Sequence, residues 1–216
     1  MTTVLSTLNV RKEPLTDGNA LFKIGYGLYI VTTRENGKDS GLVVNTVSQV
    51  ASEPSLILVS INRSNHSAEV IMRTKKMNVS VLTESAPFSL FQRFGFQSGR
   101  TADKMKGLTY GRSENNLPFL TEHSNSFLSL KVESCTKTAS HFLFLCSITE
   151  SAVLNKENSV TYAYYHENIK PKRDESSAKK GWICKICGYV HEDEVLPETF
   201  ICPLCKHPAS DFERIS

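Results

Sequence analysis

The sequence predicts a mainly β protein, in which a β-barrel is followed by a small C-terminal metal-binding module. Strand-sized apolar runs separated by turn signals extend to about residue 169, and two Cys-x-x-Cys pairs follow near the end of the chain. Between these parts, residues 170–180 contain no large apolar side chain and have the composition of a solvated linker. We therefore expect a body over residues 1–169, a basic linker over 170–180 and a module over 181–216.

The body is expected to begin with a β-hairpin. An apolar and β-branched run over residues 20–33 leads toward Asn36-Gly37, which is a strong hairpin-turn signal, and residues 41–47 supply the returning strand. Further strands are predicted at residues 56–61, 78–83, 127–133 and 141–148. A succession of strands with few helices favours a closed or nearly closed antiparallel barrel.

Two short helices are predicted between these strands. One covers residues 67–75 and follows Ser64 and Asn65, residue types that favour helix N-caps. The other covers residues 87–94, where Pro87 is tolerated because it lies in the first turn.

Composition and motifs exclude several classes of function. The chain is 40% apolar and 22% charged with a net charge of only +3, so bulk charge does not suggest a nucleic-acid partner. Its apolar runs are far shorter than the roughly 20 residues that cross a bilayer, and no secretory pattern precedes them. Rossmann, Walker and nucleophile-elbow motifs are absent from the sequence. We expect a cytoplasmic protein with no membrane association.

Charge is distributed unevenly along the chain. Residues 170–180 hold five basic and two acidic residues, whereas residues 181–216 hold three basic and six acidic ones. These opposite charges would help the module dock onto its own body or onto a partner. Ordinary solvated surface charge is the alternative explanation.

The strongest motif is a four-cysteine metal site. Cys184 pairs with Cys187, and Cys202 pairs with Cys205, each with two intervening residues. This spacing lets both thiolates of a pair converge on one ion, so two pairs supply a tetrahedral four-sulfur site. Iron and zinc both suit such a site, so the residues alone leave the metal open. The two remaining cysteines, Cys135 and Cys146, are expected to be buried thiols.

Around these cysteines the sequence resembles rubredoxin, a one-iron electron carrier. The resemblance rests on an aromatic residue before the first pair, Cys-Gly-Tyr, Cys-Pro-x-Cys and a closing Phe212. It implies one iron per chain and a miniature core formed by Trp182, Tyr189, Phe200 and Phe212. The loop between the pairs is shorter than in free rubredoxin and resembles the rubredoxin-like end of rubrerythrin. A zinc ribbon is the alternative.

The body is similar to the flavin-reductase-like family over residues 20–166. The segments that carry this similarity, in order, are residues 41–50, 54–63, 67–71, 94–100 and 103–104. The resemblance implies an FMN-binding split β-barrel, generally a homodimer, that often accepts electrons from a nicotinamide. It also places Tyr162, Tyr165 and His166 in the closing strand of the barrel, as packing residues.

A flavin phosphate needs hydroxyls, backbone N–H groups and a cation, preferably where a strand leads into a helix. Ser60, Asn62, Arg63 and Ser67 lie at such a passage, and the resemblance places Ser67 against the phosphate. It further implies that Asn45, Thr46 and Gln49 hydrogen-bond the isoalloxazine edge. The residues expected to complete the site, with a contribution from a neighbouring subunit, are Ser98, Gly99 and Lys104.

His141 resembles a family histidine that lies close to the nicotinamide and the flavin. Ser140 here replaces the aspartate that usually precedes this histidine. A partly buried histidine with satisfied hydrogen bonds is the alternative interpretation.

The full arrangement resembles the high-molecular-weight rubredoxins, which fuse an FMN barrel to a rubredoxin. This implies an NAD(P)H-dependent oxidoreductase that passes electrons through FMN to the four-cysteine iron, and on to an acceptor such as a flavodiiron protein that reduces O2 or NO. No residue is assigned as a general acid or base. One alternative is a free flavin reductase with an accessory metal module. The other is a non-redox split barrel with a structural zinc ribbon.

Overall fold

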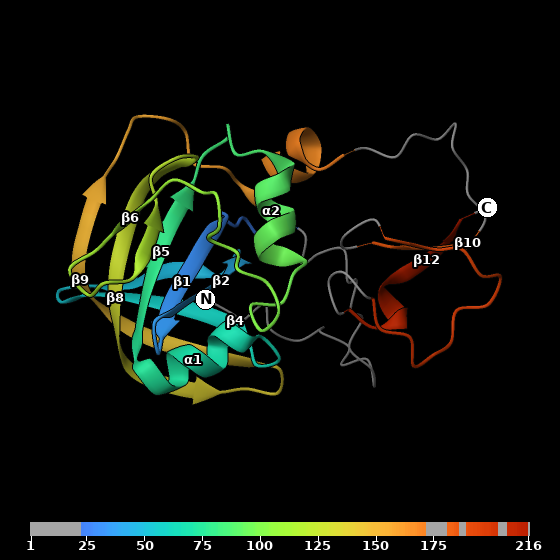
Figure 1. The fold of residues 1–216 in the computed structure, drawn as a ribbon, viewed down its shortest axis with the longest axis horizontal. Helices are drawn as coiled ribbons and strands as arrows, with labels where there is room; N and C mark the ends of the chain where they lie inside the picture. The colour runs from blue at the N-terminus through green and yellow to red at the C-terminus, as the bar shows by residue number, and fades with distance from the viewer. Residues whose placement is uncertain (1–22, 172–180, 186–188, 203–206, 216) are drawn as a thin grey trace, which may run out of the picture.

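A seven-stranded antiparallel sheet that curls around one core forms the body of the protein (Figure 1). The computed structural model describes residues 23–171, 181–185, 189–202 and 207–215. The sheet has the order β2-β1-β5-β8-β9-β4-β3. Its strands are β1 (Tyr29–Glu35), β2 (Lys38–Val44), β3 (Val47–Ser52), β4 (Ser55–Asn62), β5 (Lys76–Leu82), β8 (Ser124–Lys137) and β9 (His141–Val153). The short pair β6 (Tyr110–Arg112) and β7 (Pro118–Leu120) forms a separate two-stranded sheet.

The interior of the curled sheet is a single apolar core. It receives buried side chains from β1, β2, β4, β5, β8 and β9, among them Val31, Val59, Val79 and Phe144. Alternate residues of each strand point inward, so strands from all parts of the sheet meet in one interior. This confirms the predicted mainly β fold with a barrel-like body.

The predicted hairpin is confirmed. β1 and β2 pair from Tyr29↔Val44 to Glu35↔Lys38, and the turn residues Asn36 and Gly37 have φ values of 50° and 78°. Two successive positive φ angles match the right-handed twist of the flanking strands, which explains the Asn-Gly pair.

The four further predicted strands also appear, with longer bounds for β8 and β9. Irregular register at Ser129/Leu130 and Val132/Ser134 lets this long pair bend around the core. The sequence does not predict β3, because this strand lacks an alternating apolar pattern. Most of its side chains are exposed at the edge of the sheet.

Both predicted helices are confirmed. α1 (His66–Thr74) starts after Asn65 and buries Ala68 and Ile71 in the barrel core. α2 (Phe88–Gly95) starts after Pro87, and its buried face packs into a second core outside β1 and β2. Among the described residues, no helix is long and apolar enough to span a membrane.

The predicted closing strand at Tyr162, Tyr165 and His166 is wrong. These residues form the short helix α3 (Tyr162–Tyr164) and a π-helical turn over Tyr165–Ile169. The Thr161 hydroxyl accepts a hydrogen bond of 3.1 Å from the Tyr164 N–H, which caps the helix. Tyr165 is buried and its ring centroid lies 4.6 Å from that of Phe91, so its packing role is nevertheless confirmed.

The C-terminal module contains a three-stranded sheet of order β11-β10-β12, formed by β10 (Gly181–Cys184), β11 (Val190–His191) and β12 (Phe212–Ile215). Cys184, Cys202 and Phe212 form its buried cluster. The predicted core residues Trp182, Tyr189 and Phe200 pack against that cluster. Most of the predicted linker, together with Cys187 and Cys205, lies outside the described residues.

Candidate flavin cavity and metal centre

A cavity of about 590 Å³ opens where β2, the β4–α1 turn and the segment after α2 converge. Its volume is typical of ligand sites, which measure about 300–1,000 Å³. The predicted flavin residues that line it are Asn45, Thr46, Ser60, Asn62, Ser67, Ser98, Gly99, Lys104 and His141. Residues that are distant in the sequence therefore share one hollow.

One wall of the cavity is held by hydrogen bonds between Thr46 and Ser60. The Thr46 hydroxyl donates to the Ser60 carbonyl at 2.7 Å, and the Ser60 N–H donates to the Thr46 carbonyl at 3.0 Å. These bonds tie the connection between β2 and β3 to β4. The wall is therefore formed before any ligand binds.

Helix α1 begins at the cavity. The Asn62 side-chain oxygen accepts hydrogen bonds of 2.9 Å from both the N–H and the hydroxyl of Ser64, which shapes the turn out of β4. Asn65, His66 and Ser67 then line the cavity, and the Asn65 side chain makes no cap hydrogen bond. The first N–H groups of a helix lack intrahelical partners and carry partial positive charge, so this corner suits a phosphate.

The Ser67 hydroxyl lies 2.8 Å from the Ser40 hydroxyl in a buried contact between α1 and β2. Gly99 approaches the same pair so closely that a Cβ there would lie 2.8 Å from the Ser40 hydroxyl. A side chain at this position would force the Ser40 hydroxyl to shift and would disturb its contact with Ser67.

Lys104 is buried beside the cavity, with 5% of its surface exposed. Its ammonium donates hydrogen bonds of 2.9 Å to the carbonyls of Gly41 and Phe94, linking β2 to the end of α2. Burial lowers the pKa of Lys104 from its ordinary value to about 8, because water no longer stabilises its charge.

The structure does not bring Gln49 and Arg63 into the cavity. The Gln49 side chain donates to the carbonyl of Ala51 at 3.1 Å on the exposed edge strand. The Arg63 guanidinium donates to the carbonyls of Thr138 and Ala139, at 3.3 and 3.0 Å. The Arg63 side chain therefore closes the turn before β9 instead of facing a phosphate.

His141 pairs with Asn62 across β9 and β4 at the cavity. Its Nδ1 lies 2.7 Å from the Ser140 hydroxyl. The serine therefore contacts the ring nitrogen as a neutral group, whereas the family's usual aspartate would contact it as a charged one.

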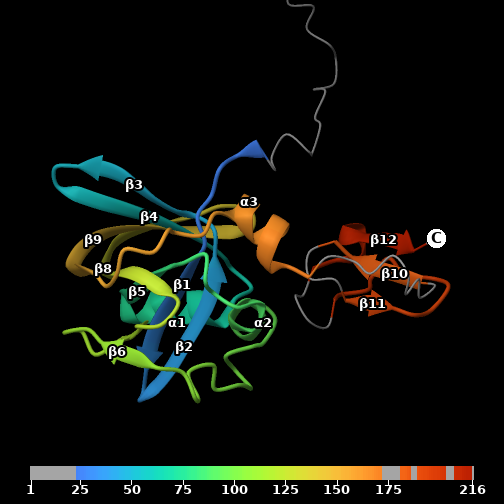
Figure 2. The ribbon, with the colours of Figure 1, turned by 90° about the horizontal axis from the view of Figure 1, so that it is seen from above.

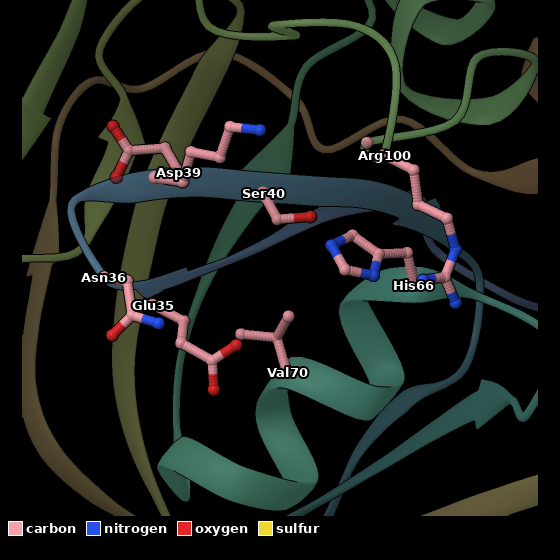
Figure 3. A pocket seen from close by; sticks show the side chains of 9 residues that line it. Glu35, Asn36, Asp39, Ser40, His66, Val70 and Arg100 are labelled. Carbon is pink, nitrogen blue, oxygen red and sulfur yellow. The ribbon is translucent and has the colours of Figure 1, made fainter.

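Sequence reasoning missed two potentially cationic residues that line the cavity, His66 and Arg100. Both also line an adjoining cavity of about 360 Å³ between the β1–β2 hairpin and α1. Figure 3 shows Ser40 and His66 facing one another, with Arg100 alongside. Arg100 pairs with Glu69 at 2.7 Å, and the buried Nδ1 of His66 has no hydrogen-bond partner within the described part of the chain. The position of His66 directly after a predicted N-cap was the available signal.

Two cysteines of the predicted metal site are described, and both are buried: Cys184 is 1% and Cys202 is 0% exposed. The N–H of Cys184 donates to the Tyr189 carbonyl, and that of Cys202 donates to the His207 carbonyl, both at 2.8 Å. In both halves of the module, the N–H of a cysteine thus donates to the carbonyl of the residue five positions later. Two buried thiols in one small cluster with matching turns fit a metal held between paired knuckles.

The module also reaches the candidate flavin cavity. His207 and Pro208 line it together with the residues of the barrel. Phe96, which follows α2 and lines the same cavity, packs against the module's buried cluster. No sequence pattern indicated this contact, because it joins segments about a hundred residues apart.

Comparisons with known proteins match this geometry. The flavin reductase like domain family matches residues 21–173, and the rubrerythrin, rubredoxin-like domain matches residues 182–213. The high molecular weight rubredoxin of Moorella thermoacetica is 33% identical over 228 aligned positions, covering 92% of this chain and 100% of that protein.

The chain belongs to the flavin reductase-like family. It carries a C-terminal rubredoxin-like domain at residues 182–213. A second relative of this flavin reductase-like protein is a ferric-chelate reductase (NAD(P)H) of Archaeoglobus fulgidus, 34% identical over 72% of this chain and 92% of that protein.

Solved structures agree on the fold. Nitrilotriacetate monooxygenase component B of Mycobacterium thermoresistibile matches with a TM-score of 0.61 at 20% identity, covering 74% of this chain and 92% of that chain. The two domains together identify this flavin reductase-like protein as an oxidoreductase that transfers electrons by way of a flavin, and they imply a flavin and an iron as its cofactors.

Proposed function

We propose that this protein passes electrons from NAD(P)H through FMN to one iron on four cysteines, and from there to an external acceptor. The observation that carries the proposal is the single cavity lined both by the predicted flavin residues and by His207 and Pro208 of the rubredoxin-like domain. A flavin in this cavity would lie next to the domain that holds the iron.

We place the FMN phosphate at the N-terminus of α1. Supporting groups are the helix N–H groups and the hydroxyl of Ser67. Arg100, and His66 when protonated, are better placed than Arg63 to contribute charge, because they line the cavity and Arg63 does not. Asn45 and Thr46, on the other side of the cavity, are available to the isoalloxazine edge.

The proposed iron ligands are Cys184, Cys187, Cys202 and Cys205. Burial of Cys184 and Cys202 favours the site, because a shielded thiolate pair is stabilised by a metal and not by water. A bound flavin would supply the change from two-electron to one-electron chemistry: each hydride from NAD(P)H carries two electrons, which leave singly in two reductions of ferric to ferrous iron. The barrel side chains bind and orient the flavin.

We further propose a homodimer in the cytoplasm, where reducing conditions keep thiolates available for metal. A flavodiiron protein that reduces O2 or NO is the proposed acceptor. The expectation of a dimer rests on family membership, and light scattering of the purified protein tests it.

A visible spectrum with metal analysis of the protein as isolated tests the proposal. We expect flavin bands, ferric–thiolate absorption and one iron per chain. After stopped-flow mixing with NADH, the flavin bands should bleach before the ferric–thiolate band, because a one-electron centre cannot accept a hydride. A colourless zinc protein would instead indicate the non-redox split barrel. Loss of FMN during gel filtration would indicate a free flavin reductase. Iron that bleaches ahead of the flavin would refute the proposed order.

A further inference from the structure

The rubredoxin-like domain lies beside the barrel on the side where α2 lies, as both views show (Figures 1 and 2). We propose that Phe96 is the centre of a docking surface on the barrel, whose occupant is the cysteine-knuckle face of the rubredoxin-like domain of the same chain. Electrons would pass from flavin to iron in this docked state. The inference rests on the proposed function and adds the surface that makes the transfer possible.

Phe96 joins the two domains through apolar contact. It follows α2 directly, and its ring meets that of Phe88 edge to face with centroids 6.2 Å apart, which orients it. On the other side it packs against the cluster of Cys184, Cys202 and Phe212. One side chain that lines the flavin cavity therefore also touches the cluster that contains two predicted iron ligands.

Polar contacts also link the described residues beside Cys184 and Cys202 to the body of the protein. Lys170 donates a 3.1 Å hydrogen bond from its ammonium to the carbonyl of Lys185, the residue after Cys184. His207, whose carbonyl accepts the N–H of Cys202, lines the flavin cavity. Lys170 thus holds the residue after Cys184, and His207 lines the cavity together with Phe96.

The composition of the surfaces suits a reversible contact. The rubredoxin-like domain carries six acidic and three basic residues, a net charge of −3, whereas residues 1–169 carry a net charge of +3, so opposite net charges favour contact between the domain and the barrel. A short tether typically gives a millimolar effective concentration, so a small apolar contact is sufficient for docking. The same knuckle face must then leave the barrel to meet an external acceptor. We therefore infer that internal docking and the acceptor compete for one face of the domain.

The test compares Phe96→Asp with Val153→Asp in the full-length protein carrying both cofactors. Val153 is 80% exposed and lies at the opposite end of β9 from His141, so it controls for an added carboxylate. After NADH mixing, the second, ferric–thiolate phase is analysed separately from the flavin phase. We expect its first-order rate to fall at least tenfold in Phe96→Asp and to remain unchanged in Val153→Asp.

Amide hydrogen exchange of the oxidised proteins gives a second readout that does not depend on turnover. Residues 181–185 and 207–215 should exchange faster in Phe96→Asp, because the docked face becomes exposed to solvent. Lys170→Ala, which removes the side-chain hydrogen bond to Lys185, should give a smaller change in the same direction. This milder variant keeps the test valid if Phe96→Asp does not fold.

The outcomes separate docking from function. In one outcome, Phe96→Asp and Lys170→Ala both retain flavin and iron and match wild type in the rate of the ferric–thiolate phase and in amide exchange. In that case the proposed docking surface is wrong, whereas the electron-transfer proposal stands. A second phase that slows on dilution would overturn the proposal by showing that the domain docks on another chain. Absence of flavin or iron from the wild-type protein would instead refute the proposed function.

Discussion

Single residues at the start of α1 decide where a phosphate can bind. Ser67 is 3% exposed, lines the cavity and contacts Ser40, whereas the guanidinium of Arg63 is committed to two carbonyls in the turn before β9. Neighbours in the sequence thus have different surroundings, because the chain turns sharply between them. The sequence predicted both Ser67 and Arg63 as phosphate contacts, and the geometry supports Ser67 but not Arg63.

Ser67→Ala and Arg63→Ala should therefore have different effects on the affinity for FMN. A hydrogen bond to a charged group contributes about 1.5–3 kcal/mol, so Ser67→Ala should raise the FMN Kd by about ten- to a hundredfold. Arg63→Ala should change it by less than about twofold, since that side chain lies outside the cavity. Fluorescence titration of the flavin-free proteins measures both. Riboflavin lacks the phosphate, so its Kd should differ little between Ser67→Ala and wild type. A larger loss of FMN affinity in Arg63→Ala than in Ser67→Ala would show that Arg63 contacts the phosphate.

Lys104 should make stability depend on pH in a defined window. In the unfolded chain, Lys104 keeps its proton up to the ordinary lysine pKa. In the folded protein, Lys104 releases this proton near pH 8. Unfolding therefore takes up a proton at pH values between the folded and the ordinary lysine pKa. The free energy of unfolding should therefore rise with pH in that window. The neutral amine still has two N–H groups for the carbonyls of Gly41 and Phe94, so the link between β2 and α2 persists.

Urea unfolding of flavin-free wild type and Lys104→Met at about pH 7.5 and about pH 9.5 measures this contribution. Wild type should gain about 2 kcal/mol relative to the variant over that interval, from 1.4 kcal/mol per unit of pKa shift. An equal pH response in both proteins would mean that burial leaves the titration of Lys104 unchanged.

At the scale of secondary structure, the packing of α2 on β2 shapes the cavity wall. Gly41 faces Phe94 so closely that a Cβ on Gly41 would lie 2.9 Å from the phenylalanine ring and 3.1 Å from the Val31 carbonyl. Phe94 is 1% exposed and belongs to the second core, so moving its ring would disturb the packing around it. The missing side chain of Gly41 lets the helix lie directly on the strand.

Gly41→Ala should destabilise the barrel by about 1–3 kcal/mol, the usual cost of inserting a methyl group into a packed interior. FMN should also bind more weakly, because Gly41 and Phe94 line the cavity. Gly25→Ala is the matched control, since a Cβ there meets no atom within 4 Å. Thermal unfolding compares the two variants, and equal stability would show that α2 adjusts without cost.

For the whole molecule, the two domains depend on different sources of stability. The barrel buries an extensive apolar core, whereas the described part of the rubredoxin-like domain has a buried cluster of only Cys184, Cys202 and Phe212 with a few aromatic rings around it. A domain of this size needs a metal to fold stably. Of the two cysteines expected to be buried thiols, Cys146 is fully buried in the barrel, where burial raises the pKa of its thiol to about 12, whereas Cys135 is only partly buried.

Cys184→Ser should thus abolish ferric–thiolate absorption and unfold the rubredoxin-like domain while the barrel keeps its flavin. Metal analysis, visible spectra and limited proteolysis measure the three effects. Cys135→Ser serves as the control, because Cys135 lies on β8 in the barrel. This variant should retain its full iron content. Full iron in Cys184→Ser would exclude this cysteine as a ligand, and loss of flavin in the same variant would show that the barrel depends on the metal.

Local patterns in the sequence determined the β-hairpin at Asn36-Gly37, the inner strands, both main helices and the paired cysteines. These features follow from turn chemistry, apolar periodicity and ligand spacing, each of which acts over a few residues. The tertiary structure decided which polar residues share the cavity: it joined Ser67 to Ser40 and Lys104 to Gly41, and it turned Gln49 and Arg63 elsewhere. It also made a helix of the expected closing strand and brought Phe96 against Cys184 and Cys202. Such contacts depend on strand register and on packing between distant segments, which no short stretch of sequence encodes.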